Sequence, residues 1–161
     1  MFDEVACRNL EIITREDARA IDLLGSRLLV RAGADATGGA FCLLEMEVPA
    51  GGGVPLHYHP YPEVFHMIWG RLEFLRIENG AEEWIAALPG ETIFVPPNVR
   101  HALRNCDHSS ARLLVVVNEE HLKFFEEAGV VADPNLPPVS PSEQDLSRVL
   151  RIAAKYEMFL G

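Results

Sequence analysis

The strongest constraint on the fold is a series of short apolar segments, rich in β-branched and aromatic residues, that fills the middle of the chain. Turn-forming groups such as Asn79-Gly80, Pro89-Gly90 and Pro96-Pro97-Asn98 separate these segments. Short strands spaced about ten residues apart, with no helices between them, are typical of a β-sandwich or barrel. The segments are VFHMIWG, RLEFLRI, EEWIAAL, TIFVP, HALRN and ARLLVVV.

The composition changes after Val117, where two helices are predicted. Residues 118–129, NEEHLKFFEEAG, place apolar side chains at helical spacing and end in glycine, a common helix stop. The sequence SPSE at 140–143 reads as an N-cap, a first-turn proline and a capping-box acid. We expect this tail, residues 119–161, to pack outside a barrel core that spans about residues 27–118. Because 161 residues is an ordinary size for one domain, the chain is predicted to form a single domain.

The charge balance and the cysteines limit the partners and the compartment. The chain carries 24 acidic and 14 basic residues, for a net charge of −10. Nucleic acids and anionic membrane surfaces favour clustered Lys and Arg, so neither is expected as a partner. Cys7, Cys42 and Cys106 form no CxxC pair, as expected for a reduced, cytoplasmic protein. We find no signal peptide and no apolar run long enough to span a membrane.

Two histidines and a glutamate lie close together in the segment HYHPYPE. Residues two apart in a strand face the same side, so His57 and His59 point the same way, about 6–7 Å apart at Cα. Nitrogens at that separation can reach one metal ion at bond lengths of about 2.1 Å. The turn containing Pro60 and Pro62 can bring the carboxylate of Glu63 back toward them. Two histidines and a carboxylate form a facial set that leaves positions open for substrate or oxygen.

A second segment supplies one more histidine. Pro96-Pro97-Asn98 predicts a tight turn directly before a strand that begins at His101. In a closed barrel the ring of His101 can point inward toward the first cluster.

Together the two segments resemble the paired motifs of the cupin superfamily, G-x5-HxH-x3-E-x6-G and G-x5-P-x-G-x2-H-x3-N. The first motif matches at every specified position, from Gly51 to Gly70. The second, from Gly90 to Asn105, matches except at Asn98, where the family pattern has glycine. The family's glycine suggests a left-handed backbone conformation, and Asn is the non-glycine residue that adopts it most readily.

The resemblance implies an all-β jelly roll, a double-stranded β-helix closed into a barrel with an internal cavity. It also implies one divalent transition metal. The family's metals are iron, manganese, nickel, copper and zinc, and the ligand set does not choose among them. The ligands carried over from the family are His57, His59, Glu63 and His101.

Strand alternation predicts which side chains line the cavity beside the metal. Two strands contribute, one beginning at Glu63 and the other at His101. The predicted pocket residues are Phe65, Met67, Trp69, Leu103 and Asn105. The side chain of Asn105 could instead form a hydrogen bond across the barrel and not contact a ligand.

The remaining three histidines are expected away from the site. His66 falls on the outward face of its strand by the same alternation. His108 lies in a turn, and His121 lies in the first predicted tail helix. Both are expected to be exposed to solvent.

The resemblance implies a metal-dependent enzyme of the dioxygenase type, similar to the small quercetin-dioxygenase-like cupins. Glu63 is the expected catalytic residue, since it can move a proton if it loosens from the metal. The apolar lining indicates a small, weakly polar or aromatic substrate, because a sugar phosphate needs converging Lys or Arg. A metal-dependent isomerase or lyase, and a small-molecule binding protein without turnover, remain as alternatives. The resemblance further implies a homodimer.

Overall fold

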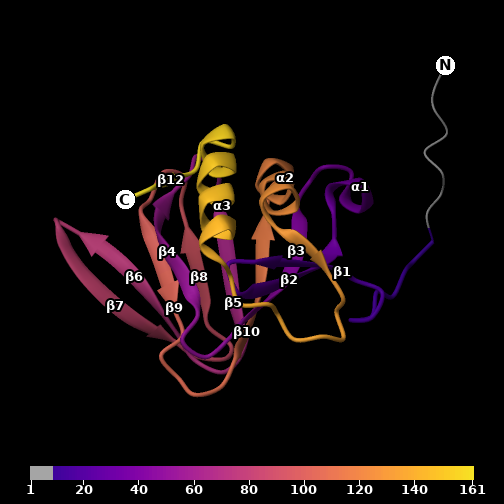
Figure 1. Ribbon diagram of the computed structural model, residues 1–161, viewed down its shortest axis with the longest axis horizontal. Coiled ribbons are helices and arrows are strands. Elements are labelled where there is room, and N and C mark those ends of the chain that lie inside the picture. Colours follow the sequence, from indigo (N-terminus) through magenta and orange to yellow (C-terminus); the bar gives the residue numbers. More distant parts are fainter. Residues whose placement is uncertain (1–8) are drawn as a thin grey trace.

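Two antiparallel β-sheets form the body of the protein (Figure 1). The computed structural model describes residues 9–161; Cys7 lies outside this range, and Cys42 and Cys106 are free thiols. The larger sheet has seven strands, which are β1 (Arg19–Leu23), β2 (Ser26–Ala32), β3 (Cys42–Val48), β5 (Glu63–Trp69), β8 (Thr92–Val95), β10 (Ala111–Val117) and β11 (Val130–Ala132). The smaller sheet has five, which are β4 (Gly53–Tyr58), β6 (Leu72–Glu78), β7 (Ala81–Ala87), β9 (His101–Arg104) and β12 (Phe159–Leu160).

The strand order identifies the topology. The larger sheet runs β11-β1-β2-β3-β10-β5-β8 and the smaller runs β12-β4-β9-β6-β7. From β3 to β10 the chain crosses repeatedly from one sheet to the other, as in a jelly roll. The predicted all-β jelly-roll fold is therefore confirmed. The sheets also extend past the predicted core of residues 27–118, because β1, β11 and β12 add strands at their edges.

The core lies between the two sheets, and β10 shows how the sequence builds it. This strand is paired on both sides, with β3 and β5. Its alternate residues Ala111, Leu113, Val115 and Val117 are buried, while the residues between them are half-buried. Burying each such Val or Leu side chain stabilises the fold by about 1.5–3 kcal/mol.

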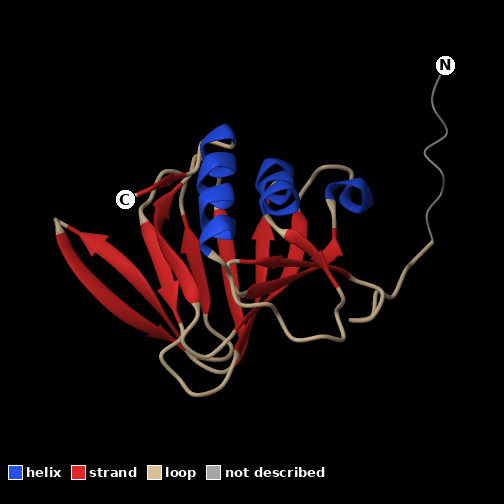
Figure 2. Ribbon diagram, viewed as in Figure 1, coloured by secondary structure: helices blue, strands red, loops and turns tan. Residues whose placement is uncertain are grey.

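Three helices gather on one side of the molecule (Figure 2). They are α1 (Ala34–Thr37), α2 (Glu119–Ala128) and α3 (Glu143–Lys155). The cap of α3 is Ser142, whose side chain forms a capping box with Asp145. The predicted cap at Ser140 with Glu143 is therefore wrong by two residues, because the same spacing of serine and acid recurs there. Within residues 9–161, no helix has the length and apolar character needed to span a membrane.

A buried arginine forms an ion pair within the larger sheet and also binds the connector that follows β11. The Arg27 guanidinium donates to both carboxylate oxygens of Asp22, at 2.7 and 2.9 Å. It also donates to the main-chain carbonyls of Asp133, at 2.9 Å, and Leu136. Only 3% of Arg27 is exposed, so one side chain joins β1 and the connector away from solvent.

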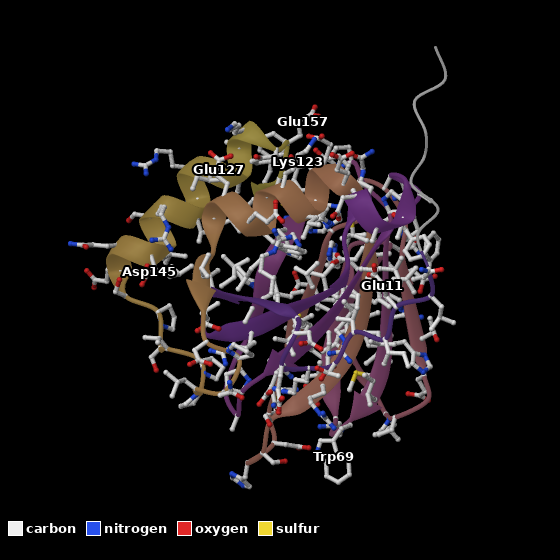
Figure 3. The ribbon with its side chains drawn as sticks, turned by 90° about the vertical axis from the view of Figure 1, so that its right-hand side faces the viewer. Glu11, Trp69, Lys123, Glu127, Asp145 and Glu157 are labelled. Carbon is white, nitrogen blue, oxygen red and sulfur yellow. The ribbon has the colours of Figure 1, made fainter. Side chains whose placement is uncertain are left out.

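The prediction that Trp69 faces the cavity is wrong. Its exposed fraction is 61%, and it projects from the end of the molecule opposite the helices (Figure 3). The register of β5 against β10 shifts at this point, since Leu113 pairs with Met67 but Arg112 pairs with Trp69. The extra residue, Ile68, breaks the strict alternation on which the prediction rested.

Asn98 adopts the left-handed conformation that its motif position suggests, with φ of 63°. Its main-chain N–H donates to the carbonyl of His59 at 2.8 Å, which joins the two motif segments.

We expect Asn98→Gly to change the free energy of unfolding by less than about 0.5 kcal/mol, and Asn98→Val to lower it by about 1–2 kcal/mol. Urea denaturation checks both variants. Equal stability of the two would contradict a backbone requirement at this position.

Candidate metal centre

The predicted ligands come from both sheets and meet between them. His57 lies on β4 and pairs directly with His101 on β9, and His59 is the first residue after β4. Glu63 is the first residue of β5 in the opposite sheet. One ring nitrogen from each of the three histidines lies within 4.8 Å of the other two. Two of the histidines lie in neighbouring strands and the third directly follows one of them, and the fold brings the three together.

Main-chain carbonyls hold the three rings. A carbonyl oxygen only accepts hydrogen bonds, so the Nδ1 atom that contacts it carries the proton. The Nε2 atom of each ring is then unprotonated, and its lone pair is free for a metal. The Nδ1-to-oxygen distances are 2.8 Å from His57 to Pro55, 2.9 Å from His59 to Tyr61 and 2.8 Å from His101 to Val99.

Glu63 closes the donor set. Its Oε2 lies 3.3 Å from Nε2 of His59 and 3.5 Å from Nε2 of His101. Burial raises the pKa of Glu63, while positive charge on the neighbouring His121, His101 or His59 would lower it, and the net shift is downward. The carboxylate is therefore ionised, as a metal ligand must be.

The free nitrogens show that a metal fits this cluster. Nε2 of His59 and Nε2 of His101 are buried and have no hydrogen-bond partner. A buried polar atom without a partner costs about 1–3 kcal/mol. A divalent ion among these donors would satisfy both nitrogens, and imidazole with carboxylate is a donor set that transition metals favour. The cluster can therefore hold a metal.

Burial keeps two imidazoles neutral and makes the metal-free fold sensitive to acid. Burial and the neighbouring His101 lower the pKa of His57 to about 4, and burial lowers the pKa of His121 to about 3. In the unfolded chain histidine has a pKa of about 6.5, so below that pH the unfolded state gains protons that the native state does not bind.

We therefore expect the stability of the metal-free protein to be full above pH about 6.5 and to fall toward pH about 4. Each of the two histidines contributes up to about 1.4 kcal/mol per pH unit. Urea denaturation in the presence of a chelator, from pH 7.5 to 4.5, measures this slope. His108→Ala, which removes an exposed histidine, should leave it unchanged. A flat profile would contradict burial of neutral imidazoles.

His121 is a member of the cluster that sequence reasoning missed. We expected it to be exposed, but only 2% of it is, and its donor atom lies within 4.8 Å of those of His59 and Glu63. It lies on the same helix face as Leu122 and Phe125, at positions that bury apolar side chains. The position of His121 on the apolar face of its helix was the sequence signal that could have predicted its burial. His66, by contrast, bonds Thr92 outside the cluster.

An apolar cavity of about 100 Å³ lies beside the donors. Of the predicted pocket residues, Phe65 and Leu103 line it, whereas Met67 is buried in the core and does not. The Asn105 amide donates to the carbonyls of Val48 and Ser109, so its side chain is used within the barrel wall. Helix α3 and the residues after it form the outer wall, through Leu146, Val149, Leu150, Ala153, Met158, Phe159 and Leu160.

Comparison with known proteins agrees with this geometry. The family model described as "Cupin domain" matches residues 44–117, which include all four predicted ligands. Residues 44–117 therefore form a cupin domain. A search of curated protein sequences gave no significant match.

Solved structures resemble this chain at low sequence identity. The polyketide cyclase RemF from Streptomyces resistomycificus is 21% identical, with a TM-score of 0.59 over 85% of this chain and 90% of that one. A predicted oxalate decarboxylase from Thermotoga maritima is 17% identical, with a TM-score of 0.57 over 67% of this chain and 98% of that one. At this identity the likeness concerns the fold, and the quercetin-dioxygenase-like subtype stays a prediction.

Proposed function

We propose that this cupin is a metal-dependent enzyme of the dioxygenase type that acts on a small, weakly polar or aromatic molecule. The observation that carries the proposal is a ready donor set at the wall of an apolar cavity. Three imidazoles and a carboxylate suit iron, manganese, nickel, copper or zinc. These donors are fewer than an octahedral ion accepts, which would leave a position open for substrate or oxygen.

The cavity lining supports the choice of substrate. Among the described residues that line it, Glu63 is the one acidic group, and none is Lys or Arg. Aromatic contact is available from Phe65, Phe124 and Phe125. A small dianion such as oxalate would instead need basic side chains to converge on it. An aromatic or otherwise weakly polar molecule carrying oxygen atoms suits this lining.

The residues around the cavity have separate roles in this proposal. A bound divalent ion would supply Lewis-acid chemistry, polarising oxygen atoms of the substrate. Glu63 is the proposed catalytic group, because it is ionised, faces the cavity and can accept a proton when it loosens from the metal. Phe65 and Leu103 hold the substrate from the barrel side, and the side chains of α3 exclude water from the other side.

An isomerase or lyase is the second candidate. Chemistry of that kind needs an acid–base pair inside the cavity, and Glu63 lies beside His121 there. The third possibility, a binding protein without turnover, would return its ligand unchanged.

Oxygen uptake separates these candidates. The metal-loaded protein is offered catechols, enediols and β-diketones while dissolved oxygen and the products are followed together. Consumption of oxygen in proportion to product, abolished in Glu63→Gln and unaffected in His108→Ala, is the result expected of a dioxygenase. Product without oxygen uptake would favour the second candidate, and a bound but unaltered ligand would favour the binding protein.

The homodimer is also a proposal. Strands β7 and β8 lie at the ends of their sheets, each paired on one side only within the described chain. Exposed apolar side chains lie on them, including Trp84, Ile85 and Phe94. We expect sedimentation analysis to give the mass of two chains, and Phe94→Glu to shift it toward one. A single-chain mass for the unaltered protein would refute the dimer.

A further inference from the structure

Helix α2 brings a fifth donor to the metal centre from outside both motifs. The helix begins at Asn118, whose side chain accepts a hydrogen bond from the amide of His121 at 2.9 Å. This cap fixes the first turn of the helix, on which His121 lies. The side chain of His121 is buried beneath the helix, against the barrel.

Neighbouring rings pack against the His121 imidazole, edge-on or tilted. Its ring centroid lies 4.6 Å from that of His59, which belongs to the barrel, and 4.5 Å from that of Phe125, which belongs to the same helix. Tyr61 lies further away, at 6.0 Å. The ring therefore packs directly on a metal ligand, with an orientation set by its neighbours.

One ring nitrogen of His121 lacks a hydrogen-bond partner, a role that a bound ion could fill. Nδ1 is buried and has no hydrogen-bond partner. The donor atoms of His121, His59 and Glu63 all lie within 4.8 Å of one another. Donors bound to one ion at about 2.1 Å are about 3–4.2 Å apart. A small adjustment around a metal brings the three into that range, and two imidazoles with one carboxylate form a facial set.

We propose that His121 is a ligand of the metal centre, so that metal binding fastens helix α2 to the barrel. This inference rests on the proposed metal centre and adds a ligand that neither motif contains. A ligating His121 is not free to exchange protons, which also weighs against the isomerase or lyase.

A metal bound to α2 would also hold α3, which covers the cavity, in place. Helices α2 and α3 lie side by side (Figures 1 and 3). Glu127 of α2 accepts hydrogen bonds from Lys155, at 2.7 and 3.0 Å, and from the Tyr156 hydroxyl, at 2.6 Å. Because α3 supplies the outer wall of the cavity, a metal bound to His121 links the barrel to that wall.

The direct test is made on the unaltered sequence, and a His121→Phe variant serves only to assign the signals. Protein labelled with 15N-histidine is loaded with 113Cd2+, and couplings between cadmium and ring nitrogens identify each coordinating imidazole. Four coupled rings, assigned through His121→Phe, are expected. Coupling to three rings, with His121 uncoupled, would overturn the inference and leave the metal centre intact. If no ring is coupled and no cadmium binds, the metal centre itself fails.

Hydrogen exchange gives an independent readout of the link. In the wild type we expect Zn2+ to slow amide exchange in residues 119–128 as well as in β4 and β9. In His121→Phe, which keeps an aromatic ring, Zn2+ should still protect β4 and β9 but no longer α2, and the Zn2+ affinity should fall by about 10-fold or more. His108→Ala is the matched control. Wild-type affinity and wild-type protection of α2 in His121→Phe would overturn the inference.

Discussion

The double variant His57→Ala/His101→Ala is expected to lose the metal when purified without a chelator. It removes two of the three imidazoles whose Nδ1 atoms are held by carbonyls, so the remaining donors are His59, Glu63 and His121. Loss of a residue that only supports a ligand commonly lowers affinity by 10–100-fold, so removal of two ligands should lower it by more than about 100-fold. Elemental analysis and competition with a chelator measure the change.

The control for this experiment is His108→Ala, which removes an exposed histidine and should bind metal as the wild type does. Both variants should keep the circular dichroism of a β-protein, because His57 and His101 contribute little to the apolar core. A double variant that holds a full equivalent of metal at wild-type affinity would show that these residues are not the ligands.

Arg27→Ala is expected to cause the largest loss of stability, about 3–5 kcal/mol. The substitution leaves the Asp22 carboxylate without its partner in a site from which water is largely excluded. It also frees the carbonyls of Asp133 and Leu136, which the guanidinium holds. Urea denaturation gives the magnitude, and limited proteolysis should show earlier cleavage in the connector that follows β11.

A double-mutant cycle separates the ion pair from the loss of packing. In Arg27→Ala/Asp22→Ala the unpaired buried charge is gone, so the double variant should be more stable than Arg27→Ala alone. Arg76→Ala, which breaks an exposed ion pair with Glu83, should cost less than about 1 kcal/mol. Similar losses for Arg27→Ala and Arg76→Ala would contradict the importance of burial.

The strand pattern was sufficient to predict a β-sandwich or barrel, and the motif resemblance added the jelly roll and the four donors. Both depend on features that are local in the sequence. His57 and His59 are separated by one residue, so strand geometry alone puts their rings on one side. Asn98 could be read as a left-handed turn residue because few residue types tolerate that conformation. Such features depend on neighbours in the chain and need no knowledge of distant contacts.

The features that were missed depend on contacts between distant segments. Trp69 faces solvent because of a register shift against β10, a strand more than forty residues later, and alternation within one strand cannot reveal it. His121 reaches the cluster because its helix folds back over the barrel. From the sequence, an amphipathic helix is known to bury one face, but what that face covers is set by the tertiary fold.

The carbonyl contacts of the three ligand rings have an evolutionary consequence. Carbonyl oxygens of Pro55, Tyr61 and Val99 exist whatever side chains stand at those positions, so the orientation of each ring is inherited with the backbone. Residues that face the cavity can then change without misaligning the ligands. A scaffold of this kind lets substrate preference diverge among descendants while the inorganic chemistry stays the same.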